Sequence, residues 1–526
     1  MVVATLSAAT GIPEQNLTLV LSILFGYLAA IIYRIALLRP LKTVWAPFIR
    51  NLYVTVSGLS ISYFFNGSDI KHSLITTIVT WFLCYFGDLI GNRKLACASS
   101  FVFNFSYLIV GYYVTATDEY DIDWTMPQCV LCLRMIGFSM DFMDGAKSSK
   151  SSVPVNSEKK TDDNKKVDSQ SDALTKRPPK QPISFEKNIQ LQTLPPLIET
   201  IGYAYFFGAF LIGPQFSFNL YRKFITMNLF PDPNNIPTGS YRYALKSFLI
   251  GALYLGVQQI AVGFFPMSYL LTKEYAAKSL IQRLAYMWMA GKFSFTKYLG
   301  IWTLAEGSCI LSCISFNGYD ANGDPEWNGL ANVDKIKFEF ATSLNQIVGA
   351  FNTNTNIWTK IYIFKRLIFL GNKNLSSLGA LLFLALWHGV YSGYFICFSL
   401  EYVDIETEKR WVKRLEPYTK PLYDSKNELK YKTIRGLHKF ACWFGQTCGL
   451  HYAMVSFELL KWDKVVTAYN SVYWIGHIVV FTLLFADMIL PKRRTKKTEK
   501  IISLDEKVNN NVNNGYVNGT TKVKEQ

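Results

Sequence analysis

The chain has 526 residues, of which 50% are hydrophobic and 15% are aromatic, and its mean hydropathy is +0.14. This composition is typical of a polytopic membrane protein and excludes a soluble two-domain enzyme as the default interpretation. The formal charge is +16, with Lys and Arg mostly in loops and tails, which favours positive-inside topology and contact with anionic membrane lipids over nucleic-acid binding.

Apolar runs in the first part of the chain predict membrane crossings. Arg34 and Arg39 lie at the C-terminal end of the first run, which predicts that this end faces the cytosol. The nine cysteines lie largely within apolar runs, so we interpret them as buried small residues, with no metal site and no disulfide framework. Residues 1–144 are therefore predicted to form N-terminal transmembrane segments, with crossings at 17–38, 43–65, 72–91, 95–114 and 126–143.

The next segment, 145–190, is rich in Ser, Lys, Asp and Pro and has almost no aromatic residues. Such a composition cannot bury a core, so it predicts a disordered charged loop. Apolar sequence then resumes, and 191–491 is predicted to be one helical core. Its expected segments are 197–213, 244–271, 280–316 (one long or two broken helices), 434–460 and 471–490.

The apolar stretch Leu378–Leu400 has no charged side chain, and at ~1.5 Å per helical residue it covers about 34 Å, enough for one crossing. His388 lies near its middle. An ionisable ring at that depth needs a partner or a polar cavity. Two interpretations stay open: a histidine hydrogen-bonded between helices, or a functional group. Gly389 and Gly393 follow on the same predicted helix and permit close approach of another helix or a long thin ligand.

A second unusual stretch is FNTNTNIW, in which Asn352, Asn354 and Asn356 alternate with other residues. Three amides facing lipid would be costly, so this stretch must lie inside protein or at an aqueous cavity. The following run, 358–370, has apolar residues at helical spacing and predicts an interfacial amphipathic helix. Its Lys365 and Arg366 could contact coenzyme A phosphates or could equally be lipid anchors.

Together His388 and Asn352 could perform acyl transfer. A neutral imidazole can take a proton from a hydroxyl as that oxygen attacks a thioester. An amide can orient the ring or donate to the developing oxyanion. The sequence contains no serine or cysteine nucleophile motif, which favours direct transfer without a covalent acyl-enzyme.

These residues resemble those of the membrane-bound O-acyltransferase (MBOAT) family, which pairs an Asn in a WN-x5-W-like motif with a His in an apolar helix. Here the motif reads Phe351-Asn352, five residues, then Trp358, with Phe replacing the leading Trp; the histidine stands in LWHG. Together with GPQFSF and LAEG, the runs FNTNTNIW, YIFKRLIFLGNKNLS and LLFLALWHGVYSGY resemble the lysophospholipid acyltransferase branch. The resemblance covers most of the chain from about 190 to 490.

The resemblance implies an all-α bundle of roughly eleven transmembrane helices with re-entrant and interfacial helices; the apolar runs alone predict nine to eleven crossings. It implies that His388 and Asn352 are the catalytic positions and that acyl-CoA is a co-substrate, with no permanently bound cofactor. Lys365, Arg366 and Trp358 are the candidate acyl-CoA contacts. The expected acceptor is lysophosphatidylcholine, lysophosphatidylethanolamine or lysophosphatidylserine. The alternatives are a sterol, diacylglycerol or protein acceptor, or a transporter whose intramembrane His and Asn line a solute path.

The chain ends in Lys522-Val-Lys524-Glu-Gln. This resembles the K-x-K-x-x signal that retrieves membrane proteins to the endoplasmic reticulum through coat machinery. The signal must be cytosolic, and the basic cluster after residue 491 predicts that 492–526 is a cytosolic, disordered tail. The expected location is the endoplasmic reticulum membrane; a homodimer stays open.

Overall fold

The computed structural model describes residues 2–117, 122–150, 183–186, 189–423 and 429–491. These residues form helices joined by turns and loops, and no strand occurs among them, so the predicted all-α class is confirmed. The α-helices are α1 (Val2–Thr10), α2 (Glu14–Ala36), α3 (Ala46–Asn66), α4 (Ile70–Leu89), α5 (Arg93–Val114), α6 (Thr125–Lys150), α7 (Leu197–Ala204), α8 (Phe218–Ile225), α9 (Ser240–Phe264), α10 (Lys273–Ala276), α11 (Leu280–Leu311), α12 (Lys335–Glu339), α13 (Leu344–Ala350), α14 (Thr353–Tyr362), α15 (Lys373–His388), α16 (Ser392–Thr419), α17 (Lys432–Leu459), α18 (Trp462–Asn470) and α19 (Ile475–Ile489). Short 3₁₀ helices are η1 (Gly67–Asp69), η3 (Met267–Leu271), η4 (Phe364–Leu370) and η5 (Lys420–Tyr423).

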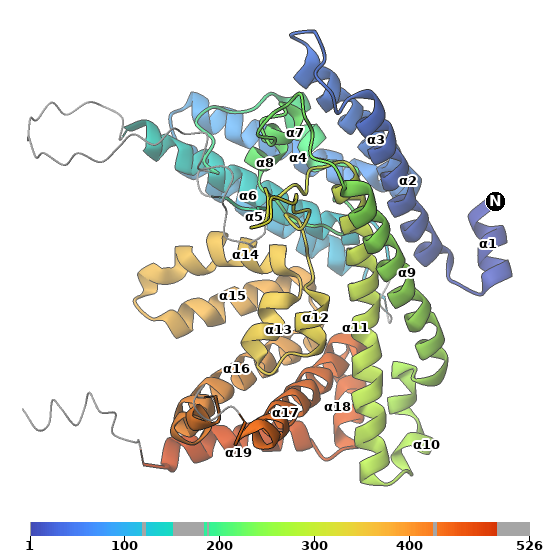
Figure 1. Cartoon of the computed structure of the whole chain (residues 1–526), viewed down its shortest axis with the longest axis vertical. Helices are drawn as coiled ribbons and strands as arrows, with labels where there is room; N and C mark the ends of the chain where they lie inside the picture. Colours follow the sequence, from blue (N-terminus) through green and yellow to red (C-terminus); the bar gives the residue numbers. More distant parts are fainter. Residues whose placement is uncertain (1, 118–121, 151–182, 187–188, 424–428, 492–526) are drawn as a thin grey trace, which may run out of the picture.

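The helices occupy three zones along the long axis of the molecule (Figure 1). Helices α2–α8 lie at one end, α16–α19 lie at the other, and α12–α15 lie between them. The long helices α9 and α11 run along one side and connect the zones. Helix α11 is one unbroken helix of 32 residues, about 48 Å long at 1.5 Å per residue. The open choice between one and two helices at 280–316 is thus decided in favour of one.

The pair α9 and α11 packs closely because glycine faces glycine. A Cβ on Gly251 would lie 3.0 Å from the backbone oxygen of Gly300, and a Cβ on Gly300 would lie 2.9 Å from Leu255. Small residues at such a crossing let two helix backbones approach, which is the usual device where lipid supplies no hydrophobic force between helices. A capping box of Ser279 and Gln282 starts α11 and satisfies amide groups at its N-terminus.

The end formed by α2–α8 is organised around a buried cation. Arg134 on α6 is 1% exposed. Its Nη1 donates to the carbonyls of Tyr203 and Ala204, both at 3.1 Å, and its Nη2 donates to those of Ala209 at 3.0 Å and Pro214 at 3.4 Å. Four carbonyls, two at the end of α7 and two in the segment between α7 and α8, are therefore satisfied by one side chain, which is how backbone without helical hydrogen bonds can be buried.

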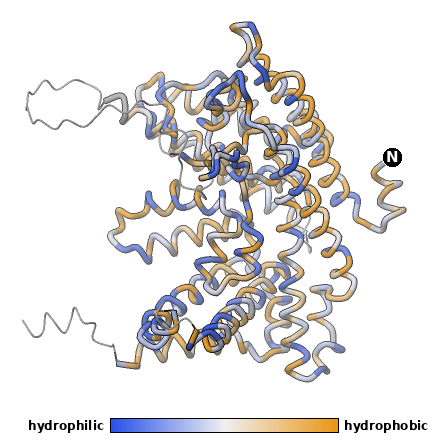
Figure 2. The backbone as a smooth tube through the Cα atoms, viewed as in Figure 1, coloured by the Kyte–Doolittle hydropathy of each residue, from blue (hydrophilic) through white to orange (hydrophobic). Residues whose placement is uncertain are grey.

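Apolar side chains face outward along several helices. Figure 2 shows hydrophobic residues along much of α2 and α9. Within the most apolar part of Ser240–Leu271, only 11% of the residues are buried. By length and composition, three described spans suit a membrane crossing: Glu14–Ala36, Arg93–Val114 and Ser240–Leu271. The pair α18 and α19, bent by 81°, would add a fourth as a broken or re-entrant span. The prediction of roughly eleven crossings is not confirmed.

Two predicted segments have different boundaries. The run 358–370 is not one amphipathic helix, because α14 ends at Tyr362 and η4 follows. The predicted loop 145–190 has ordered ends: α6 continues to Lys150, and the amide of Ile183 donates to the carbonyl of Gly329 at 2.9 Å. Residues 151–182, 187–188 and the tail with Lys522 and Lys524 lie outside the described residues.

Candidate active site

His388 is the last residue of α15, at a break that the apolar pattern did not predict. Gly389 has φ +142° and ψ −175°, a region of backbone space that only glycine occupies readily. Helix α16 starts three residues later, at Ser392. The predicted continuous crossing Leu378–Leu400 is therefore wrong. The ring lies where two helices meet, and not in the middle of one helix.

Aromatic rings surround the half-buried His388 side chain. Its ring centroid lies 4.6 Å from that of Trp387, 5.6 Å from Tyr394, 5.4 Å from Phe398 and 5.1 Å from Phe457. No hydrogen bond joins the imidazole to another residue of the described chain. Among the described residues, the histidine therefore does not form a hydrogen bond between helices, and neither ring nitrogen has a hydrogen-bond partner.

The backbone on either side of the ring is tethered to the N-terminal helices. The hydroxyl of Tyr112 on α5 donates to the carbonyl of Trp387 at 2.9 Å, and the Trp387 indole donates to the carbonyl of Cys129 on α6 at 2.8 Å. After the break, the Tyr391 hydroxyl donates to the carbonyl of Thr117 at 2.9 Å. These bonds hold the end of α15 in position.

Asn352 lies immediately before α14 in a left-handed conformation, with φ 46° and ψ 44°. Asn adopts this region more readily than most residues. Its side-chain oxygen accepts a hydrogen bond from the Asn332 amide at 3.2 Å, and the Thr353 amide donates to the Asn332 carbonyl at 3.0 Å. The Asn352 side chain is therefore oriented by a second asparagine.

The other two asparagines of the run are structural. Asn354 is buried and donates to the carbonyls of Leu330 and Ala331 at 3.3 and 3.1 Å. Asn356 donates to the carbonyls of Val348 and Phe351 at 2.8 and 2.9 Å. The prediction that this run lies inside the protein is confirmed, and the amides satisfy carbonyls of the neighbouring loops.

Helices α14 and α15 pack together, but no hydrogen bond joins His388 to Asn352 within the described residues. A series of aromatic rings lies between His388 and the residue that precedes Asn352. Phe457 contacts His388, and its centroid lies 6.3 Å from that of Tyr298, which lies 6.4 Å from Phe351, the neighbour of Asn352. A series of ring contacts therefore runs from His388 to Phe351, the residue that precedes Asn352.

Sequence reasoning missed an ion pair beside this cluster. Lys297 of α11 contacts Glu458 of α17 at 2.8 Å, and the Tyr298 hydroxyl lies 3.4 Å from the same carboxylate. Glu458 directly follows Phe457, so the pair links α11 to the helix that covers the His388 ring. The sequence shows Lys297 and Glu458 as isolated charges in two apolar helices. Because they are 161 positions apart, the sequence does not indicate that they pair.

The three candidate acyl-CoA residues lie in different environments. Arg366 pairs with Asp144 of α6 at 2.6 Å, whereas Lys365 is exposed. Trp358 is 1% exposed, and its ring packs against Phe383 at a centroid distance of 5.8 Å. Of the two cationic candidates, Arg366 is therefore paired, whereas Lys365 is exposed and has no ion-pair partner among the described residues.

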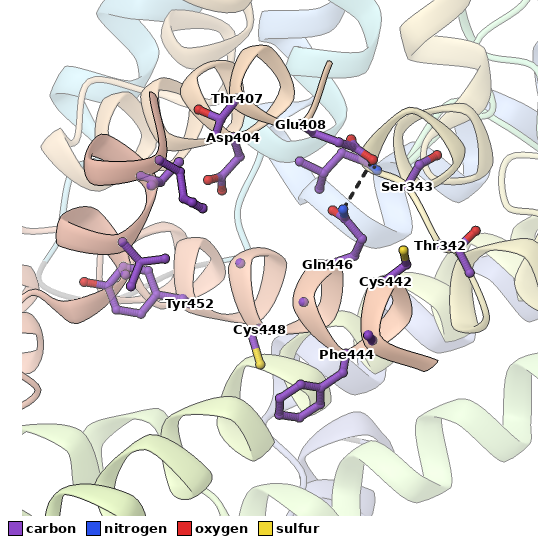
Figure 3. Close-up of a pocket in the computed structure, with 18 of the residues that line it drawn as sticks. Thr342, Ser343, Asp404, Thr407, Glu408, Cys442, Phe444, Gln446, Cys448 and Tyr452 are labelled. Carbon is purple, nitrogen blue, oxygen red and sulfur yellow. Dashed lines mark hydrogen bonds between the residues drawn. The ribbon is translucent and has the colours of Figure 1, made fainter. Parts of the chain in front are cut away.

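A cavity of about 1490 Å³ lies between α11, α16, α17 and α19 (Figure 3). Neither His388 nor Asn352 lines it. Most of its wall is apolar, and the polar groups include Asp404, Glu408 and Gln446. It exceeds the ~300–1,000 Å³ of ordinary small-molecule sites, so it is large enough for a long-chain ligand.

An all-helical body with outward apolar faces defines a helical, polytopic membrane protein. Residues 109–423 match MBOAT, the membrane-bound O-acyltransferase family, and this stretch contains both Asn352 and His388. The chain belongs to that family and is an acyltransferase.

Relatives match almost the whole chain. It is 36% identical to lysophospholipid acyltransferase 5 of Mus musculus over 94% of this chain and 93% of that protein. It is 35% identical to the Homo sapiens protein of the same name, over 95% and 94% of the two chains. The Drosophila melanogaster protein of that name is 32% identical over 91% and 88%.

Proposed function

We propose that this enzyme transfers a fatty acyl group from acyl-CoA to the free sn-2 hydroxyl of a lysophospholipid with a choline, ethanolamine or serine head group. The observation that carries the proposal is the His388 imidazole, caged by four aromatic rings and free of hydrogen bonds to the described residues. The names of the mouse, human and fly relatives support the acceptor class.

In the proposed reaction, the acceptor hydroxyl oxygen attacks the thioester carbonyl carbon while His388 takes the hydroxyl proton. The carbon–sulfur bond breaks, the new ester forms, and the coenzyme A thiolate receives the proton from His388. Asn352 orients a reacting group or donates to the developing oxyanion. Asn332 donates a hydrogen bond to the side-chain oxygen of Asn352, so the side-chain nitrogen of Asn352 can serve as the donor. Acyl-CoA is a co-substrate, and Lys365 is the candidate for contact with its phosphates.

The test is acyl transfer by purified protein in detergent. Labelled acyl-CoA is supplied with lysophosphatidylcholine, cholesterol, diacylglycerol or a peptide, and product and free coenzyme A are both measured. Lysophospholipid should be acylated far faster than the others, because a site with polar groups for a charged head group leaves them unpaired with an acceptor that lacks one. A preference for sterol or diacylglycerol would overturn the acceptor class. Solute flux across reconstituted vesicles, without coenzyme A release, would instead favour the transporter.

We also propose that the enzyme resides in the endoplasmic reticulum membrane with a cytosolic C-terminus, and that coat machinery reads the retrieval signal of Lys522 and Lys524. The K-x-K-x-x ending supports this location. A homodimer remains part of the proposal, and the mass of the purified protein in detergent would test it.

A further inference from the structure

The wall of the large cavity has carboxylates on one side. Asp404 and Glu408 lie one turn apart on α16, and Figure 3 shows both directed towards α17. Glu408 is held by hydrogen bonds from the Leu344 amide at 2.9 Å and from the Gln446 side chain at 3.3 Å. Asp404 forms no hydrogen bond or ion pair with any residue of the described chain. A carboxyl group without a described partner is thus presented to an otherwise largely apolar space.

Among the described residues, the basic side chains that line the cavity form no ion pair with Asp404 or Glu408. Lys439 lines it but is exposed and forms no ion pair with either carboxylate among the described residues. His438 also lines it, and its Nδ1 is bonded to the Tyr423 hydroxyl at 2.8 Å. A carboxyl group that faces an apolar wall without a partner of its own is complementary to a ligand that supplies a cation.

We propose that Asp404, beside Glu408, binds the ammonium group of the lysophospholipid acceptor and selects its head group. The inference rests on the proposed function and names the chemistry within that acceptor class. Trp288 and Trp411 also line the cavity, and aromatic rings suit quaternary ammonium groups. The apolar remainder of the wall receives the acyl chain of the acceptor.

The cavity and the histidine share two helices. On α16, Phe398 stacks on His388, and Asp404 lies about 9 Å further along the helix axis at 1.5 Å per residue. On α17, Phe457 contacts His388 and Tyr452 lines the cavity. This separation is within the reach of an extended phospho-head group, so an ammonium at Asp404 is compatible with a glycerol hydroxyl near His388.

The test compares Asp404→Asn with the parent enzyme on two kinds of acceptor. Lysophosphatidylcholine and lysophosphatidylethanolamine carry an ammonium, whereas lysophosphatidylinositol and lysophosphatidic acid do not. Loss of a charge-assisted contact should reduce kcat/KM for the first two by roughly tenfold to hundredfold, mainly through KM. Values for the other two should not fall. Glu406→Gln is the matched control, because Glu406 lies on the same helix but pairs with Lys409 at 2.9 Å and does not line the cavity.

A second measurement does not depend on turnover of the probe. Hexadecyltrimethylammonium has the cation and a chain but no hydroxyl, and we expect it to compete with lysophosphatidylcholine. Its inhibition constant should rise in Asp404→Asn, whereas that of hexadecyl maltoside, which has the chain alone, should not. Equal changes for both detergents, or equal losses for all four acceptors, would overturn the assignment of Asp404. Failure of the parent enzyme to acylate any lysophospholipid would overturn the proposed function itself.

Discussion

Replacement of Gly389 by Ala tests whether the break after His388 positions the ring. Gly389 has φ +142° and ψ −175°, where a residue with a Cβ is strained by ~1–3 kcal/mol. The added Cβ would also lie 3.0 Å from a ring carbon of Tyr394, which is 3% exposed and packs on the His388 ring. The backbone or the Tyr394 ring must therefore move, and either movement shifts His388.

A displacement of ~1 Å of a reacting group costs about a hundredfold in rate. We therefore expect Gly389→Ala to lower kcat by roughly ten- to a hundredfold while KM for acyl-CoA changes little. The free energy of unfolding should fall by no more than the ~1–3 kcal/mol of backbone strain. The assay is initial-rate coenzyme A release by purified protein, with thermal unfolding in the same detergent measured in parallel.

Gly371→Ala is the matched control. Gly371 has φ +72°, and a Cβ there would have nothing within 4 Å. Alanine should cost ~1–2 kcal/mol of stability without changing kcat, because Gly371 has no contact with the rings around His388. A wild-type kcat in Gly389→Ala would refute the positioning argument. An equal loss of kcat in both variants would show that backbone strain at either glycine lowers activity, and that the position beside His388 is not special.

Three further predictions concern other parts of the chain. Arg134→Met leaves four buried carbonyls without their donor, so at ~1 kcal/mol for each we expect a loss of about 4 kcal/mol; a thermal midpoint unchanged from the parent would contradict the structural role. His388→Ala should reduce kcat at least ~10²-fold with the fold intact, and if Asn352→Ala fails equally and the double variant is no worse, the two act as a unit. Serine at Lys522 and Lys524 should release protein from the endoplasmic reticulum with unchanged specific activity, and an unaltered distribution by microscopy would show that the retrieval signal is not required.

Much of the fold class could be predicted because composition and apolar periodicity are local properties. The apolar runs correctly located α2, α5, α9 and the long α11, although their ends shifted by a few residues. The alternating asparagines required a protein interior, and Asn354 is buried as expected. Helix breaks were harder to predict. Gly389 is compatible with a continuous apolar helix and with a turn, and only the packing of Tyr394 and the tethers to α5 and α6 select the turn.

The sequence by itself determined that this is a membrane-embedded helical protein, and it singled out His388 and Asn352 by residue type in an apolar setting. Tertiary structure decided which side chains meet. Arg366 pairs with Asp144 across more than 200 positions, and the carboxylates of α16 face a cavity built by helices from three parts of the chain. A charged residue on an apolar helix has the same neighbours in sequence whether its partner is another side chain or a ligand. The partner is determined by contacts between segments that are remote in sequence, and these contacts exist only in the tertiary structure.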